Sequence, residues 1–164
     1  MITRSRGRWT ATTILTTTLL ALTMTLGAAM PASASPADHG RDPSVGYGGA
    51  APCNSNASRI GSRPVENEYG QTVATVDIYY SYSCQTNWIR VSGNPAGGNT
   101  VKDIRTAGGS WLPTEIDYGS GSSYSMQVYA PGTSCINFQV HLYYPSGASY
   151  GETYNAGSTY QTVC

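Results

Sequence analysis

The sequence is poor in the residues that build large cores or carry catalysis. It has one phenylalanine, Phe138, two histidines and one lysine, Lys102, and charged residues make up only 11% of it. No segment shows a convincing 3.6-residue period of apolar side chains, so helices should be few and short. The scarcity of Phe and Leu predicts a modest core that needs cross-links. The scarcity of histidine leaves few candidates for a general base or a metal ligand.

The first 34 residues are predicted to be a signal peptide. Residues 4–8 are arginine-rich, residues 14–27 are apolar and diluted only by threonine, and "PASA" places Ala32 and Ala34 where a signal peptidase needs small side chains. The apolar run is too short and too Thr-rich for a membrane anchor, and we expect no membrane span. Cleavage after Ala34 would give a secreted, extracellular chain.

Removal of this segment changes the net charge. All nine acidic residues follow residue 34, whereas three of the nine Lys and Arg residues precede it, so the mature balance is 6 − 9 = −3. A mildly acidic chain with one lysine lacks the basic surface that nucleic acid or an anionic membrane requires. We therefore expect neither partner.

The mature composition favours strands and turns. It is rich in Tyr, Gly, Ser and Thr, which suits β-structure rather than helix, and its length fits one domain. Residues 35–63 hold many Pro, Gly, Ser and Asn residues and predict an irregular arm pinned at Cys53. Residues 64–164 are expected to form a single β domain.

Alternation of apolar and polar residues begins at residue 71. In the first segment Ala74, Val76 and Ile78 fall on one face, followed by Tyr80, Tyr82 and Cys84. The predicted strands are 71–84, 87–91, 101–105, 111–117, 123–130, 136–142, and one or two within 150–163. Seven or eight short strands separated by turns predict an all-β fold, a small antiparallel sandwich or barrel.

Four cysteines remain in the mature chain, and an even number in an exported protein favours two disulfides. Three pairings are possible. We favour Cys53–Cys84 and Cys135–Cys164, which close loops of similar length and would hold the C-terminal segment in place. A zinc site is the alternative, but the cysteines lack the short ligand spacing that zinc sites use. We expect no metal and no cofactor.

The stretch "YSYSCQTNWIRV" (80–91) resembles the Y-S-x-x-C-x-x-x-W-x-R-V block of an uncharacterised domain family in secreted and membrane-tethered actinobacterial proteins. "GRDP" (40–43), with Cys53 ten residues later, is similar to the G-x-D-P…C opening of that family. The resemblance covers about residues 38–92. Family members often carry a further cysteine at the place of Asp38, and its absence here leaves Cys53 and Cys84 as partners. The resemblance implies no activity, because none is established for the family.

No catalytic constellation is predicted. "GASYG" (147–151) matches G-x-S-x-G, but no histidine follows it and no helix is indicated, so we interpret it as a chance match. His141 is expected on the solvent face of a strand. Glu115 and Asp117 share a strand face and could in principle support glycosidic chemistry. Two acids on the wet face of an edge strand are more common, and Pro113 indicates an edge.

Tyr79, Trp88 and Arg90 are the candidate binding residues. Alternation places Trp88 and Arg90 on the face opposite Ile89 and Val91, so both should be partly exposed and able to stack on one another. With Tyr79 they could form a flat platform for a sugar or a peptide. The alternative, which we favour, is a structural cross-strand aromatic group.

Three functions remain open. The leading hypothesis is a non-catalytic binding or structural module of the cell exterior, with a cell-wall polysaccharide or an extracellular protein as partner, because tyrosine is abundant and no active site is visible. The second is a secreted protease inhibitor with "APGTSCI" (130–136) as its loop. The third is a small hydrolase.

Overall fold

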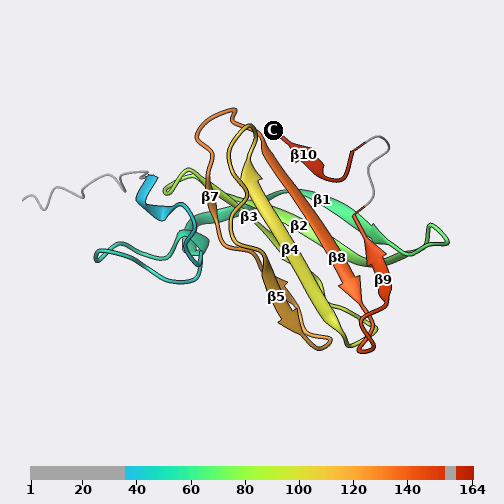
Figure 1. Ribbon diagram of the computed structural model, residues 1–164. Helices are drawn as coiled ribbons and strands as arrows, with labels where there is room; N and C mark the ends of the chain where they lie inside the picture. The colour runs from blue at the N-terminus through green and yellow to red at the C-terminus, as the bar shows by residue number, and fades with distance from the viewer. Residues whose placement is uncertain (1–35, 154–157) are drawn as a thin grey trace, which may run out of the picture.

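The computed structural model describes residues 36–153 and 158–164. The predicted signal peptide, residues 1–34, and residues 154–157 of the last predicted strand region lie outside the described residues. Within the described ranges the chain forms ten strands and two short 3-10 helices (Figure 1). The all-β prediction is confirmed.

The helices and strands have the following bounds. The helices are η1 (Pro36–Asp38) and η2 (Cys53–Asn56). The first five strands are β1 (Ala57–Glu66), β2 (Thr72–Ser81), β3 (Thr86–Val91), β4 (Asn99–Thr106) and β5 (Glu115–Tyr118). The last five are β6 (Ser123–Tyr124), β7 (Val128–Tyr129), β8 (Ile136–Tyr143), β9 (Ser149–Glu152) and β10 (Gln161–Val163).

All ten strands belong to one curled antiparallel sheet. Its path is β5-β4-β8-β9-β1-β2-β3-β6, with β10 also paired to β8 and β7 to β3. Between β9 and β1 the pairing is a single residue pair, Glu66↔Glu152. The sheet therefore consists of a first half-sheet (β1, β2, β3, β6, β7) and a second half-sheet (β4, β5, β8, β9, β10). This arrangement combines features of the predicted sandwich and barrel.

The core fills the space between the two half-sheets. In β2, Ala74, Val76 and Ile78 are buried, as the alternation predicted, while β3 contributes Ile89 and Val91. The inward residues of the second half-sheet are led by those of β8: Ile136, Phe138, Val140 and Leu142. The prediction was wrong for Tyr82, which is exposed, because β2 ends at Ser81 and the chain turns there.

The two ends of the sheet path meet along a line that we call the seam. Side-chain hydrogen bonds join them: Thr106 Oγ1 donates to the Tyr129 carbonyl (2.8 Å), and Lys102 Nζ donates to Ser123 Oγ (3.2 Å). The Met126 amide donates to Glu115 Oε2 (3.1 Å). Side-chain hydrogen bonds therefore join the two edges at the seam, whereas backbone hydrogen bonds join the neighbouring strands in the rest of the sheet.

The N-terminal segment is ordered against the sheet. Arg41 and Gln127 form an isolated β-bridge, and His39 Nδ1 accepts a hydrogen bond from the Tyr129 amide (3.1 Å). Strand β1 begins at Ala57, so the expected boundary of the irregular arm at residue 63 is wrong. The β1 signal is weak in the sequence because only Val65 of its ten residues is buried and the strand contains Pro64, a residue that occurs in strands mainly at edges.

Both predicted disulfides are present, Cys53–Cys84 and Cys135–Cys164. The first lies in a small apolar cluster with Trp88 on the outer face of β2 and β3. The second joins the residue before β8 to the residue after β10. The zinc alternative is excluded for all four cysteines, since none of them is free.

The different surroundings of the two disulfides predict different costs of removal. Replacing Cys135 and Cys164 by alanine should lower the free energy of unfolding by about 2–4 kcal/mol and expose β10 to hydrogen exchange. Replacing Cys53 and Cys84 should cost more, because the buried Trp88 loses its cover as well. Urea unfolding of the two double variants measures this difference, and a smaller loss for the Cys53/Cys84 variant would contradict it.

Candidate functional site

Trp88 is a buried structural residue. Its exposed fraction is 1%, and it packs against the Cys53–Cys84 disulfide. The Tyr79 ring stacks on it with centroids 5.7 Å apart and planes 9° from parallel. The prediction that Trp88 is partly exposed is wrong. Alternation did place it opposite Ile89, but the disulfide draws η2 across that outer face and covers the indole.

Arg90 does not complete the expected platform with Trp88. Its guanidinium lies over the Tyr124 ring, 5.7 Å from the centroid, and donates a hydrogen bond to Ser122 Oγ (3.2 Å). Of the three predicted binding residues, Tyr79 and Trp88 therefore form one structural pair and Arg90 belongs to a different neighbourhood. The cross-strand structural interpretation fits this geometry better than the recognition platform does.

A cleft of about 490 Å³ lies where the two half-sheets join through β1 and β9. Tyr69, Tyr144 and Tyr150 line it, and we call it the tyrosine cleft. The Tyr69 and Tyr144 side chains are 77% and 44% exposed, respectively. The rings of Tyr144 and Tyr150 meet edge to face at 5.0 Å. Its other lining residues are polar or glycine: Glu66, Asn67, Glu68, Gly70, Ser149, Gly151 and Glu152.

The turn between β1 and β2 holds Tyr69 in place. Asn67 Oδ1 accepts hydrogen bonds from the amides of Tyr69 and Gln71 (both 3.0 Å), and Asn67 Nδ2 donates to Gln71 Oε1 (2.9 Å). Asn favours such turns because its side chain can replace backbone hydrogen-bond partners. This wall of the cleft is therefore held in place by hydrogen bonds within the turn, without a ligand.

The opposite wall, which carries Tyr144, is also braced. Asn94 is fully buried, and its Nδ2 donates to the Tyr143 carbonyl (2.9 Å). Gly98 packs so closely that an added Cβ would lie 2.1 Å from the same carbonyl oxygen. Gly151 likewise lets β9 approach β1, since a Cβ there would lie 3.1 Å from the Glu66 carbonyl oxygen of β1 and 2.8 Å from the Val73 side chain of β2. The close approaches at Gly98 and Gly151 require glycine.

The tyrosine cleft is acidic. Glu66 and Glu152 stand directly opposite each other in the β1–β9 pair, where like charges are unfavourable. His141 Nδ1 lies 3.2 Å from Glu152 Oε2. A hydrogen bond to Glu68 raises the pKa of Tyr69 above 10.0. The cleft therefore offers ring faces and hydrogen-bond acceptors to a ligand.

Sequence reasoning missed this site. Tyr144 and Tyr150 lie six positions apart in the β8–β9 hairpin, but Tyr69 precedes Tyr144 by 75 positions, and no local motif connects the three. The available signal was the "NEYG" turn (67–70), which must present its tyrosine outward. G-x-S-x-G at 147–151 contributes Ser149 and Gly151 to the cleft, but Ser149 starts strand β9 and no strand-to-helix elbow forms.

A second cleft, of about 460 Å³, lies at the seam. Glu115 and Asp117 both line it, and they share a face as predicted, because they pair with Lys102 and Thr100 of β4. Strand β5 is at the edge of the sheet, as Pro113 indicated. Lys102 points inward from β4 with its side chain fully buried, and its Nζ contacts Asp117 Oδ2. Both acids therefore lie beside the buried Lys102 side chain, whose position the sequence did not predict.

Glu115 has an unusual environment. Burial raises its pKa above the ordinary 4.5, although the nearby Lys102 and the Met126 amide act in the opposite direction. Asp117 and Asp42 add to the increase. Its Oε2 accepts the Met126 hydrogen bond, whereas its buried Oε1 has no partner among the described residues.

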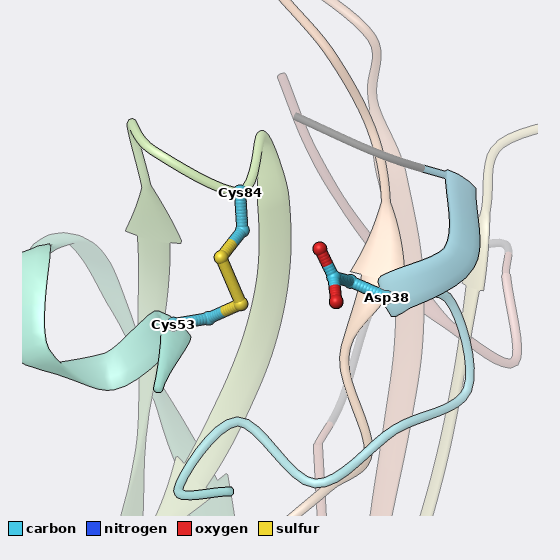
Figure 2. Close-up of side chains that lie close together, drawn as sticks. All are labelled: Asp38, Cys53 and Cys84. Carbon is cyan, nitrogen blue, oxygen red and sulfur yellow. A yellow bond between two sulfur atoms is a disulfide. The ribbon is translucent and has the colours of Figure 1, made fainter. Parts of the chain in front are cut away.

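Among the described residues, Asp38, Cys53 and Cys84 place their possible ligand atoms within 4.8 Å of one another. Figure 2 shows the Asp38 carboxylate directed toward the disulfide. Both sulfur atoms are bonded to each other, so neither is a thiolate that could bind a metal. We assign no metal site here.

The described part of the chain contains no helix with the length and hydropathy needed to cross a membrane. Comparisons with protein-family models, with curated proteins and with solved structures found no match.

The burial of Trp88 predicts a large effect of its truncation. Trp88→Ala should lower the free energy of unfolding by about 3–5 kcal/mol, as is typical for a buried aromatic residue. Arg90→Ala should cost less, about 0.5–1 kcal/mol, because Arg90 lies over Tyr124 at a half-exposed position. Trp111→Ala, at a site that is 37% exposed, is the control. Denaturant unfolding of the three variants tests the order, and an unchanged midpoint for Trp88→Ala would contradict it.

Titration of Glu115 should be visible at the Met126 amide, which donates to its carboxylate. In a ¹H–¹⁵N NMR titration, we expect the chemical shift of this amide to change with a midpoint above pH 4.5. Glu115→Gln should abolish that step. Because the folded-state pKa is raised, the contribution of Glu115 to stability is fully present below 4.5 and is lost as the pH rises through the folded-state pKa. A midpoint below 4.5 would be the contrary result.

Proposed function

We propose that this protein is an exported binding module that holds a saccharide of the cell exterior in the tyrosine cleft. One observation carries the proposal: three tyrosines from separate turns and strands converge on a braced cleft of about 490 Å³. Tyrosine rings give large contact areas with little loss of side-chain entropy. The two disulfides are consistent with an extracellular location.

The other lining groups suit a polyhydroxylated ligand. Glu66, Glu68 and Glu152 supply carboxylate oxygens, which accept hydrogen bonds from hydroxyl groups. The same charges repel anions, so neutral and amino-bearing saccharides should bind better than uronic acids. The braced walls reduce the ordering cost of binding. No chemical step on the ligand is proposed.

The geometry gives less support to a protease inhibitor. Within 130–136 the Ser134 amide donates to the Pro131 carbonyl (3.1 Å), and Gly132 has a φ of +62°. This segment is therefore a tight turn, whereas a peptide that pairs with a partner's strand edge is extended.

The test compares variants of the cleft with a matched variant outside it. Tyr69→Ala and Tyr144→Ala should each weaken binding to cell-wall polysaccharide and to soluble neutral or amino-bearing oligosaccharides by about tenfold, the equivalent of 1.4 kcal/mol. Isothermal titration and co-sedimentation measure this loss. Tyr118→Ala is the control, because Tyr118 is 78% exposed and lies on β5, outside the cleft.

Two results would overturn the proposal. One is absence of binding by the wild-type protein to the whole saccharide panel. The other is an equal loss in Tyr118→Ala, which would mean that exposed tyrosines contribute without a defined site. Binding of a cationic peptide alone would replace the saccharide by a basic protein partner.

A further inference from the structure

We propose that the seam is the site of an autocatalytic cross-link, in which the side chain of Lys102 forms an amide (isopeptide) bond with the side chain of Asp117. This inference is independent of the tyrosine cleft. It rests on the position of one lysine, two carboxyl groups and one hydroxyl group on the inward face of β4 and β5.

The reacting groups are already in contact. Lys102 is directly opposite Glu115 across the β4–β5 ladder, and Thr100 is directly opposite Asp117, so all four side chains share one face. That face points to the interior, since Lys102 also stands opposite the core residue Val140. Lys102 Nζ contacts Asp117 Oδ2. The amine and the carboxyl carbon are thus held together, which replaces a bimolecular encounter by an intramolecular one.

The Lys102 side chain is 0% exposed, so its ammonium form carries a desolvation cost that the attraction to the half-exposed Asp117 carboxylate only partly offsets. Transfer of one proton from Nζ to the Asp117 carboxylate gives an amine and a carboxylic acid, which is the reactive pair. The Asp117 side chain is 52% exposed to the seam cleft, so the released water has a route out.

The bond then forms with a balanced exchange of atoms. Nζ attacks Asp117 Cγ, a new N–C bond forms, and one C–O bond of the carboxyl group breaks. The amine gives up a proton, the departing hydroxyl group gains one, and a water molecule leaves. The product is a neutral amide in place of two charges, and no oxidant or reductant is needed.

Two buried polar atoms without hydrogen-bond partners among the described residues fit the needs of this step. Glu115 Oε1 is one of them, and it can carry the proton from Nζ to the departing hydroxyl group. Burial raises the pKa of Glu115, which favours its protonated form relative to that of an exposed carboxyl group. Thr100 Oγ1 is the other, and it can donate to the oxygen that gains negative charge.

Intact-mass spectrometry of the signal-processed protein with reduced disulfides decides the proposal. The wild-type mass should be lower than the sequence mass by one water molecule. Glu115→Gln retains an acceptor for the Met126 amide and should have the full sequence mass, as should Asp117→Ala. Asp103→Asn changes an outward position of β4, the strand that carries Lys102, and this variant should keep the lower mass.

The single lysine provides a second readout. In the unfolded, reduced wild-type protein, an amine-reactive reagent should modify the α-amino group alone, and trypsin should not cut after Lys102. No Lys or Arg follows Arg105, so the tryptic segments 91–105 and 106–164 should remain joined. The full sequence mass, two modified amines and separate segments in the wild-type protein would show that Lys102 and Asp117 form an ion pair only. The wild-type result stands even if a variant fails to fold.

Discussion

The buried side chain of Lys102 is the constraint on which the architecture depends. Its side chain lies on the inward face of β4, opposite Val140 of the core, where an unpaired ammonium would be very costly. Asp117 neutralises it, and Ser123 brings β6 within hydrogen-bond distance. The seam is thus a place where polar groups lie inside the curl. The apolar core could then remain small, in keeping with a chain poor in Phe and Leu.

The outer face of the first half-sheet shows a different solution to the shortage of apolar residues. There the Cys53–Cys84 disulfide, Tyr79 and Trp88 form a second cluster, separate from the main core. Because both faces of β2 and β3 are buried, these strands contribute to the main core on one side and to the second cluster on the other. This burial also removes Trp88 from the surface, so among the described residues the aromatic groups that a ligand can reach are the exposed tyrosines and Trp111.

The sequence predicted the strands best where alternation was long, as in β2 and β8, because one buried face and one wetter face leave a period of two. It predicted the disulfides from their number and spacing. It failed for Trp88, because alternation reports on the main core and cannot detect a covering segment. It also failed for the tyrosine cleft and for Lys102, since both depend on which distant strands become neighbours. Glu115 and Asp117 were placed on one face correctly, but their partner was not foreseen.

Each disulfide lies within one half-sheet. Cys53–Cys84 holds η2 against the end of β2, and Cys135–Cys164 joins the ends of β8 and β10. The Lys102–Asp117 pair also stays within the second half-sheet. Apart from the connecting loops, no covalent cross-link among the described residues therefore fixes the angle between the two half-sheets. That angle depends on core packing, on the connecting loops, on the single Glu66↔Glu152 pair and on the seam hydrogen bonds, so it is less constrained than the strand arrangement within each half-sheet.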